Sequence, residues 1–283
     1  MATSYIFAKE PLKSSCEKPR RVAVTGAAGD IGSSFAEYAG ERYEMKLLVH
    51  RKKNRNRVDK YGIVETGDLT DYETALNICR GMDTVVHLAA DRSAKAEWES
   101  LHPKNIIAVY NMFRAAVETG CRRIIFASSI HAVSGYPAGY QIHEEDPVNP
   151  GDLYGVTKCF GEALARLTAE QEGVSAIALR IGAFQSRIKA EHEDRIGMMN
   201  AFVSKRDLNQ LICRCIDDEY IQFAIFHALS DNLFNRMDIT GARELVDYDP
   251  DDDFTELNRE VADIHMREQV APHDTGHKQG SAL

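Results

Sequence analysis

The chain has 283 residues, of which 44% are apolar and 27% charged, as expected for a soluble globular core with room for a small additional lobe. Its formal net charge of −9 argues against a nucleic-acid partner or an anionic membrane partner. No apolar run resembles a signal peptide or a membrane span, so we expect a cytoplasmic protein with no membrane partner.

The cysteines predict neither disulfides nor a metal site. Their spacing forms no CxxC framework, which is typical of reduced thiols in the cytosol. Cys213 and Cys215 lie two residues apart, but no cluster of His and Cys partners completes a tetrahedral site. We therefore predict that the protein binds no metal ion.

Strand-like and helix-like segments alternate from residue 22 to residue 182. Short β-branched or apolar runs predict strands at 22–26, 45–50, 83–90, 123–129 and 175–182. Helical spacing predicts helices between them at 30–42, 72–81, 103–120 and 154–173, and Gly120 and Gly173 suit the ends of the last two. This alternation indicates βαβ units and a parallel sheet covered by helices on both faces.

The segments on either side of this core predict the remaining organisation. Residues 1–19 carry mixed charge without a period, and we expect them to lie outside the fold. A core at 20–182 should be followed by a small substrate-binding region at 183–265, interleaved with the core. That region contains a helix that starts near Ser204 and a strand at 221–229, and residues 266–283 read as a disordered tail.

A glycine-rich turn follows the first predicted strand. Gly26, Gly29 and Gly32 lie between that strand and the first predicted helix, as a dinucleotide-binding fingerprint requires. Glycine lets the backbone approach a pyrophosphate, and the helix N-terminus supplies free N–H groups. The fold class is therefore α/β, a Rossmann-type doubly wound parallel sheet with a small C-terminal substrate-binding lobe.

The end of the second predicted strand indicates which dinucleotide binds. NAD-selective enzymes place an acidic residue here to bind the ribose 2′-hydroxyl. In this chain no acid follows until Asp59, and Arg51, Lys52 and Lys53 can meet a 2′-phosphate. We predict NADP as the preferred cofactor, with NAD as the alternative. The alternative interpretation of these cations is a solvated basic loop, which would leave NAD use intact.

Tyr154 and Lys158 are four residues apart, so a helix places them on one face. Such pairs are also common on exposed helices. A nearby ammonium group favours the phenolate and lowers the high pKa of a tyrosine, so Lys158 should make Tyr154 a usable base.

Several spaced motifs resemble the short-chain dehydrogenase/reductase superfamily. They are the TGxxGxxG turn at 25–32, the YxxxK pair at 154–158, the serine that ends the preceding strand, "GDLTD" at 67–71 and "HLAA" at 87–90. The chain resembles the extended subgroup. It is most similar to the uronate dehydrogenases and the archaeal NAD-dependent glucose-6-phosphate dehydrogenases, through "FASSIHAV", "LYGVTK", "RIG" and the "SDN…YDPDDD" ending.

The resemblance implies a catalytic set. Ser129 would hydrogen-bond the substrate oxygen, Tyr154 would accept the hydroxyl proton, and Lys158 would also hold the nicotinamide ribose. Asn105 would help to position the lysine. The other residues expected to bind the cofactor are Ala28, Asp30, Ile31, His50, Asp68, Leu69, Leu88, Ala89, Ala90 and Ile181.

The resemblance also implies a substrate subsite. His131 would contact a ring hydroxyl, because a strand-like backbone points it to the same side as Ser129, and Arg195 would meet an anionic group of the substrate. Ser93, Ile130 and Ala183 complete the expected subsite. Ile130 and Ala183 replace an asparagine and a serine of the uronate enzymes, so two polar contacts are missing and the sugar is left open.

We therefore predict an oxidoreductase that oxidises C1 of a cyclic sugar or sugar acid to a lactone by hydride transfer to NAD(P). The sugar would be a hexuronate, a sugar phosphate or an aldose. The alternatives are an epimerase or dehydratase of nucleotide sugars, which needs a larger C-terminal lobe, and a non-catalytic NAD(P) sensor, which needs neither Tyr154 nor Lys158. We expect a homo-oligomer.

Overall fold

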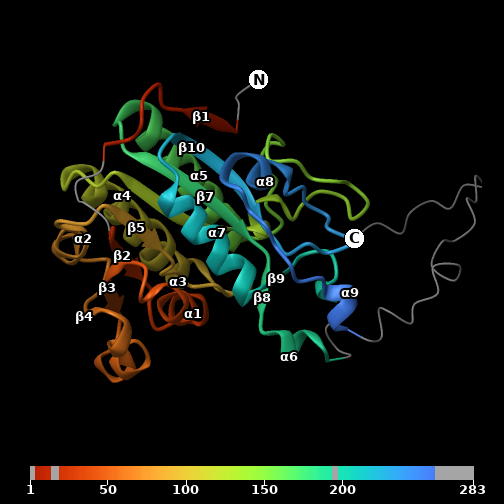
Figure 1. The fold of residues 1–283 in the computed structure, drawn as a ribbon, viewed down its shortest axis with the longest axis horizontal. Coiled ribbons are helices and arrows are strands. Elements are labelled where there is room, and N and C mark those ends of the chain that lie inside the picture. Colours follow the sequence, from red (N-terminus) through yellow and green to blue (C-terminus); the bar gives the residue numbers. More distant parts are fainter. Residues whose placement is uncertain (1–3, 14–18, 193–196, 259–283) are drawn as a thin grey trace, which may run out of the picture.

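The computed structural model describes residues 4–13, 19–192 and 197–258. Its centre is an eight-stranded sheet in the order β1-β10-β7-β6-β5-β2-β3-β4 (Figure 1). The strands of this sheet are β1 (Tyr5–Phe7), β2 (Arg21–Thr25), β3 (Glu44–Val49), β4 (Ile63–Thr66), β5 (Thr84–His87), β6 (Arg123–Ser129), β7 (Ser175–Ile181) and β10 (Ile221–Ala228). From β10 to β4 every pair of neighbours is parallel, so the predicted parallel sheet is confirmed.

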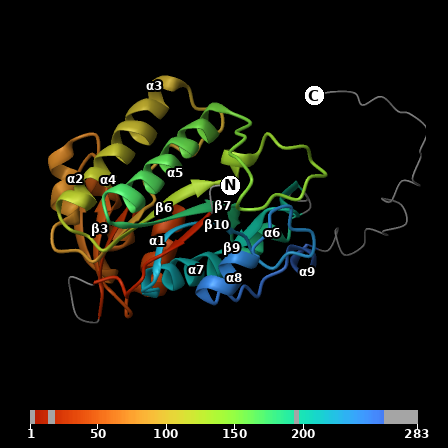
Figure 2. The ribbon, with the colours of Figure 1, turned by 90° about the horizontal axis from the view of Figure 1, so that it is seen from above.

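Helices cover both faces of the sheet (Figure 2). One face carries α2 (Tyr72–Cys79), α4 (Ala108–Glu118) and α5 (Leu153–Gln171), and the other carries α1 (Asp30–Ala39), α7 (Lys205–Asp217) and α8 (Thr240–Val246). The strands β6 and β7 are buried along their whole length, because apolar side chains from both helical layers pack on them. This layering explains why these strands read as continuous apolar runs rather than as alternating ones.

Short elements lie beyond the carboxyl end of β7. They are β8 (Ala183–Gln185) and β9 (Phe202–Ser204), which pair with each other, α6 (Arg187–Ala190) and α9 (Phe254–Leu257). The predicted N-cap of α7 is confirmed, because the Ser204 side chain accepts a hydrogen bond from the Asp207 N–H. α3 (Trp98–Leu101) leads through a π-helical turn at His102–Ile107 into α4, where the sequence predicted one regular helix.

The prediction that residues 1–19 lie outside the fold is wrong for Tyr5–Phe7. This segment forms β1, which pairs antiparallel with β10 at the edge of the sheet, and the Tyr5 ring packs 5.8 Å from the Phe226 ring. An edge strand is held largely by backbone hydrogen bonds, so its sequence needs no hydrophobic period. The predicted tail at 266–283 lies outside the described residues.

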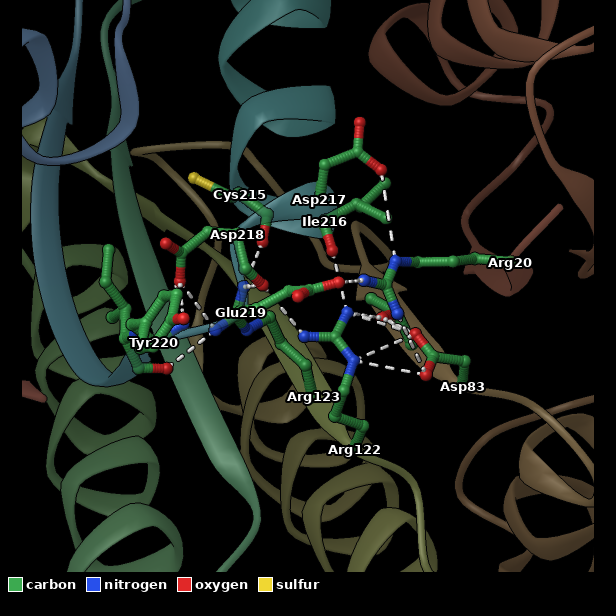
Figure 3. A network of polar contacts seen from close by, with 12 residues as sticks. Arg20, Asp83, Arg122, Arg123, Cys215, Ile216, Asp217, Asp218, Glu219 and Tyr220 are labelled. Atoms are coloured by element: carbon green, nitrogen blue, oxygen red, sulfur yellow. Dashed lines mark hydrogen bonds and ion pairs between the residues drawn. The ribbon is translucent and has the colours of Figure 1, made fainter. Parts of the chain in front are cut away.

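A buried ionic network ties the C-terminal end of α7 to the amino-terminal edge of the sheet (Figure 3). Arg122 donates to both carboxylate oxygens of Asp83, at 3.1 Å from its Nε, and to the Ile216 carbonyl at 2.7 Å. Arg123 donates to the Asp218 carboxylate at 3.1 Å. The guanidinium groups thus satisfy helix-end carbonyls that lack partners within the helix.

Replacing Arg122 with Met should lower the free energy of unfolding by about 3–5 kcal/mol, because the buried Asp83 carboxylate loses its main cation. The control is Arg80→Met, since Arg80 is exposed and its nitrogen lies 3.8 Å from the Glu73 carboxylate; its effect should stay below about 1 kcal/mol. Urea unfolding of the two variants compares them. Equal stability would contradict a structural role for the network.

Candidate active site

The carboxyl ends of β2, β3, β5, β6 and β7 meet at one edge of the sheet, because these strands are parallel. β2 lies between β3 and β5, so the chain order reverses at the β2–β5 pair. Ligands of open α/β sheets bind in the crevice at such a reversal. The structure brings the glycine turn and the predicted catalytic residues to this edge.

The glycine turn packs closely on the backbone that follows β5 and leaves the start of α1 uncapped by a side chain. Gly26 has a φ of 65°, and a Cβ at this position would lie 2.8 Å from the backbone nitrogen of Ala89 at the end of β5. Gly29 is the N-cap residue of α1 and offers no side chain, so the first N–H groups of the helix stay free for an anion. The same helix start contains four more of the residues expected to bind the cofactor, which are Ala28, Asp30, Ile31 and Gly32. These features fit the pyrophosphate of a dinucleotide.

A second group of the residues expected to bind the cofactor lies beyond the ends of β3 and β4. His50, Arg51 and Lys52 are exposed at the end of β3, and a short 3₁₀ helix spans Lys52–Arg57. Asp68 follows β4 and accepts two hydrogen bonds of 2.9 Å from Thr70, which lower the pKa of its carboxyl; the nearby His50 acts in the same direction. Leu69 is buried next to it. The structure therefore places His50 near Asp68, and both are among the residues expected to bind the cofactor.

A third group of these residues, Leu88, Ala89 and Ala90, follows β5. The Thr25 hydroxyl accepts hydrogen bonds from the Leu88 and Ala89 N–H groups at 3.2 and 3.3 Å. Ile181 ends β7 on the same edge. Asn105 is buried in the π-helical turn, where its amide bonds the Asp91 backbone and the Thr157 hydroxyl. Asn105 thus contacts α5 through Thr157, the residue before Lys158.

Ser129, Tyr154 and Lys158 converge where α5 crosses the end of β6. Asp152 caps α5 by accepting from the Gly155 N–H at 2.7 Å, which starts the helix just before the tyrosine. The Lys158 ammonium donates to the Ala127 carbonyl at 2.8 Å, and the Ser129 side chain lies close enough to the Tyr154 phenol to lower its pKa. All three side chains are buried, at the carboxyl edge of the sheet.

The expected effect of Lys158 on the Tyr154 pKa is not what the structure gives. Burial raises the pKa of Tyr154 to about 12, while the nearby Ser129 side chain acts in the opposite direction. Burial also lowers the pKa of Lys158 to about 7, against a smaller upward effect of Glu162. Desolvation disfavours the charged form of both groups, and the sequence pattern does not report burial.

A buried network of polar side chains lies next to Lys158 on α5. Glu162, one turn beyond Lys158 on α5, forms two hydrogen bonds of 3.0 Å with Arg180 of β7, and it accepts from the Ser128 hydroxyl at 2.6 Å. Neither Glu162 nor Arg180 is among the site residues predicted from the sequence. The sequence feature that could have pointed to Glu162 is its spacing of four residues from Lys158, which puts both side chains on one face of the helix.

His131 lies beside Tyr154, but not for the predicted reason. β6 ends at Ser129, and Ile130–Val133 forms a 3₁₀ turn, so the alternation of a strand does not apply to His131. The His131 Nδ1 lies 2.6 Å from the Asp152 carboxylate, and the His131 ring meets the Tyr154 ring edge-on with centroids 5.3 Å apart. Asp152 was also missed, although a residue of its type is a common helix N-cap.

The other predicted substrate residues differ in their surroundings. Ser93 is exposed beyond β5, and Ala183 begins β8. Ile130 packs against a small apolar cluster that includes Val133 and Ile142. Arg195 lies outside the described residues.

The described residues contain neither a metal site nor a membrane-spanning helix. No group of three His, Cys, Asp or Glu side chains there is arranged to hold a metal ion. None of the helices in that part of the chain combines the length and the hydropathy that crossing a bilayer requires. The cysteines at 79, 121, 159, 213 and 215 are free thiols.

Comparisons with known proteins agree with this geometry. The NAD-dependent glucose-6-phosphate dehydrogenase of Haloferax volcanii is 32% identical over 84% of this chain and 96% of its own length. The L-arabinose 1-dehydrogenase (NAD(P)(+)) of the same organism is 31% identical over 70% of this chain and 82% of its own. The crystal structure of uronate dehydrogenase from Agrobacterium tumefaciens superposes with a TM-score of 0.75 at 27% identity, covering 91% of this chain and 92% of that one.

A family model described as "NAD dependent epimerase/dehydratase family" matches residues 22–244. This match spans the sheet from β2 to β10, including the glycine turn and the Ser129, Tyr154 and Lys158 cluster. The chain belongs to the NAD dependent epimerase/dehydratase family.

Proposed function

We propose that the protein is an NAD(P)-dependent sugar 1-dehydrogenase, which oxidises C1 of a cyclic sugar or sugar acid to a lactone. The observation that carries the proposal is the convergence of Ser129, Tyr154 and Lys158 at the end of β6, beside a turn shaped for a dinucleotide. The similarity to glucose-6-phosphate, arabinose and uronate dehydrogenases supports the sugar class. The substrate would be a hexuronate, a sugar phosphate or a neutral aldose.

The residues of the site suit the removal of one proton and one hydride from a C1–OH group. Ser129 would hold the C1 oxygen, and Tyr154 would accept its proton while the C1–H leaves as hydride and the C1=O bond forms. The cofactor, when bound, accepts the hydride and brings a positively charged nicotinamide ring. Lys158 would bind the ribose hydroxyls, and its neighbour Thr157 is held by Asn105 at 3.1 Å.

The surroundings of Tyr154 determine what it needs in order to accept a proton. A tyrosine phenol is protonated at neutral pH, and burial raises the pKa of Tyr154 further, to about 12, so proton acceptance needs added positive charge near the ring. Two sources of that charge are Lys158 in its protonated form and an oxidised nicotinamide. The pKa of Lys158 near 7 means that positive charge held on the lysine depends on pH around neutrality.

NADP is the cofactor that the end of β3 supports best. Arg51 and Lys52 are exposed there and form no ion pair with a residue among those described, so both are available to a 2′-phosphate. A guanidinium and an ammonium are the usual partners of such a phosphate. Arg195 is proposed, on the resemblance alone, to meet an anionic group on the sugar.

Replacing Tyr154 with Phe should lower turnover by about 10²–10⁴-fold, because the proton acceptor is lost while the ring packing stays. Dissociation constants for the cofactor, measured by fluorescence titration, should change little. Near-normal kcat at saturating sugar and cofactor would show that Tyr154 is not the proton acceptor.

The Lys158 pKa gives a pH dependence of stability. Between pH 7 and 10.5 the unfolded state keeps the lysine proton and the folded state releases it, so the unfolded state binds more protons. The free energy of unfolding of the wild type should therefore rise with pH in this window relative to Lys158→Met, by up to about 1.4 kcal/mol per pH unit. Urea unfolding of the cofactor-free proteins at pH 7 and pH 9 measures this. Parallel pH dependence in the two proteins would show that Lys158 stays charged when folded.

Cofactor preference should depend on the exposed cations after β3. The wild type should have a higher kcat/KM for NADP than for NAD, and a double change of Arg51 and Lys52 to Ala should lower the NADP value by about tenfold or more. The kcat/KM for NAD should change little. The control is Arg57→Ala, at the far end of the same 3₁₀ helix, which should leave both values nearly unchanged. A wild-type preference for NAD would contradict the assignment.

A further inference from the structure

The Asp152 side chain joins two parts of the site. Its Oδ1 accepts from the Gly155 N–H at 2.7 Å and caps α5, the helix of Tyr154 and Lys158. Its Oδ2 lies 2.6 Å from Nδ1 of His131, on the 3₁₀ turn after β6. One carboxylate therefore couples the start of the catalytic helix to the turn that carries the histidine. α5 runs alongside β6 (Figure 2), so the link spans the two elements that build the site.

His131 is held at three points. Its backbone N–H donates to the Ser129 hydroxyl at 3.2 Å, and its ring meets the Tyr154 ring at 75° with centroids 5.3 Å apart. Its Nδ1 is the third point, through Asp152. The side chain is nevertheless 34% exposed, so a bound molecule can reach it.

The hydrogen-bond chemistry of the pair fixes the imidazole. An ionised carboxylate only accepts hydrogen bonds, so the proton of the short contact belongs to Nδ1 of His131. In a neutral imidazole Nε2 is then unprotonated, and it is the one remaining hydrogen-bonding atom of the ring. A carboxylate in this place sets both the orientation of the ring and the tautomer.

We propose that Asp152 is a positioning residue that presents Nε2 of His131 to the sugar hydroxyl next to C1. The inference rests on the proposed function, since it concerns the residues that would bind the substrate hydroxyl next to the reacting carbon. His131 lies next to Ser129 and Tyr154, which would hold the C1 oxygen, so the hydroxyl within its reach is the one on C2. Asp152 itself acts through His131 and touches no reacting atom.

The double use of the carboxylate allows the two roles to be separated. Asp152→Ser keeps a good N-cap for α5 but removes the group that binds His131. Asp152→Asn keeps the cap and the size, and loses the charge. His131→Gln removes the imidazole and serves as the background in which the Asp152 changes should have no further effect on the sugar.

The first readout is independent of activity. Long-range ¹H–¹⁵N NMR of the histidine side chains should show His131 with a protonated Nδ1 in the wild type, assigned by its disappearance in His131→Gln. Asp152→Ser should shift the ring towards the Nε2–H form. An unchanged tautomer in both Asp152 variants would overturn the proposal.

The second readout is a comparison of KM and kcat with D-glucose 6-phosphate and 2-deoxy-D-glucose 6-phosphate, and with D-glucose and 2-deoxy-D-glucose as the neutral pair. Asp152→Ser should raise KM for the 2-hydroxy sugar by about tenfold and leave KM for its 2-deoxy analogue unchanged, with smaller effects on kcat. Equal increases for both sugars, or an added increase in the His131→Gln background, would overturn the proposal. Failure of the wild type to oxidise any of the four sugars would count against the proposed function for these classes, and the NMR tautomer would then decide the role of Asp152 alone.

Discussion

The close packing of α5 on β6 is the constraint on which the site depends. A Cβ at Gly161 would lie 2.2 Å from the Phe126 ring, so a helix with any side chain at this position could not come so near to the strand. This approach puts the Lys158 ammonium 2.8 Å from the Ala127 carbonyl and the Tyr154 phenol beside Ser129. The ion pair of Glu162 with Arg180 holds the same helix to β7.

This packing also determines the electrostatics. The depth at which α5 lies removes Tyr154 and Lys158 from water, and desolvation works against both the phenolate and the ammonium. Burial thus favours the neutral form of both groups, and charge brought by a cofactor can shift the balance between their neutral and charged forms. The opposite edge of the sheet differs, because there Arg122 and Arg123 are buried with carboxylates and helix carbonyls around them.

The features that the sequence predicted are those that leave a local pattern. The apolar runs of β6 and β7 reflect burial on both faces, and the glycines at 26, 29 and 32 reflect the turn before α1. The spacing of Tyr154 and Lys158 follows from one helical turn. Each of these depends on residues close together in the chain, which is why sequence reasoning could reach them.

The features that escaped prediction depend on tertiary contacts. β1 is held by backbone bonds to a strand more than two hundred residues away, and the short β4 has too few residues for a period. The 3₁₀ turn after Ser129 interrupts the strand geometry assumed for His131, and the partners of Asp152 and Glu162 lie on other elements. The pKa values follow from burial, which a motif does not contain.

The proposed chemistry is tested most directly by following the hydrogen on C1. Sugars deuterated at C1, drawn from hexuronates, sugar phosphates and aldoses, would be incubated with the protein and oxidised NAD(P), and the cofactor and sugar analysed by mass spectrometry and ¹³C NMR. The account predicts deuterium in the reduced nicotinamide and a lactone in equal amount. Conversion of a nucleotide sugar without net reduced cofactor, while none of these sugars transfers its deuterium, would contradict it and favour the epimerase branch of the family.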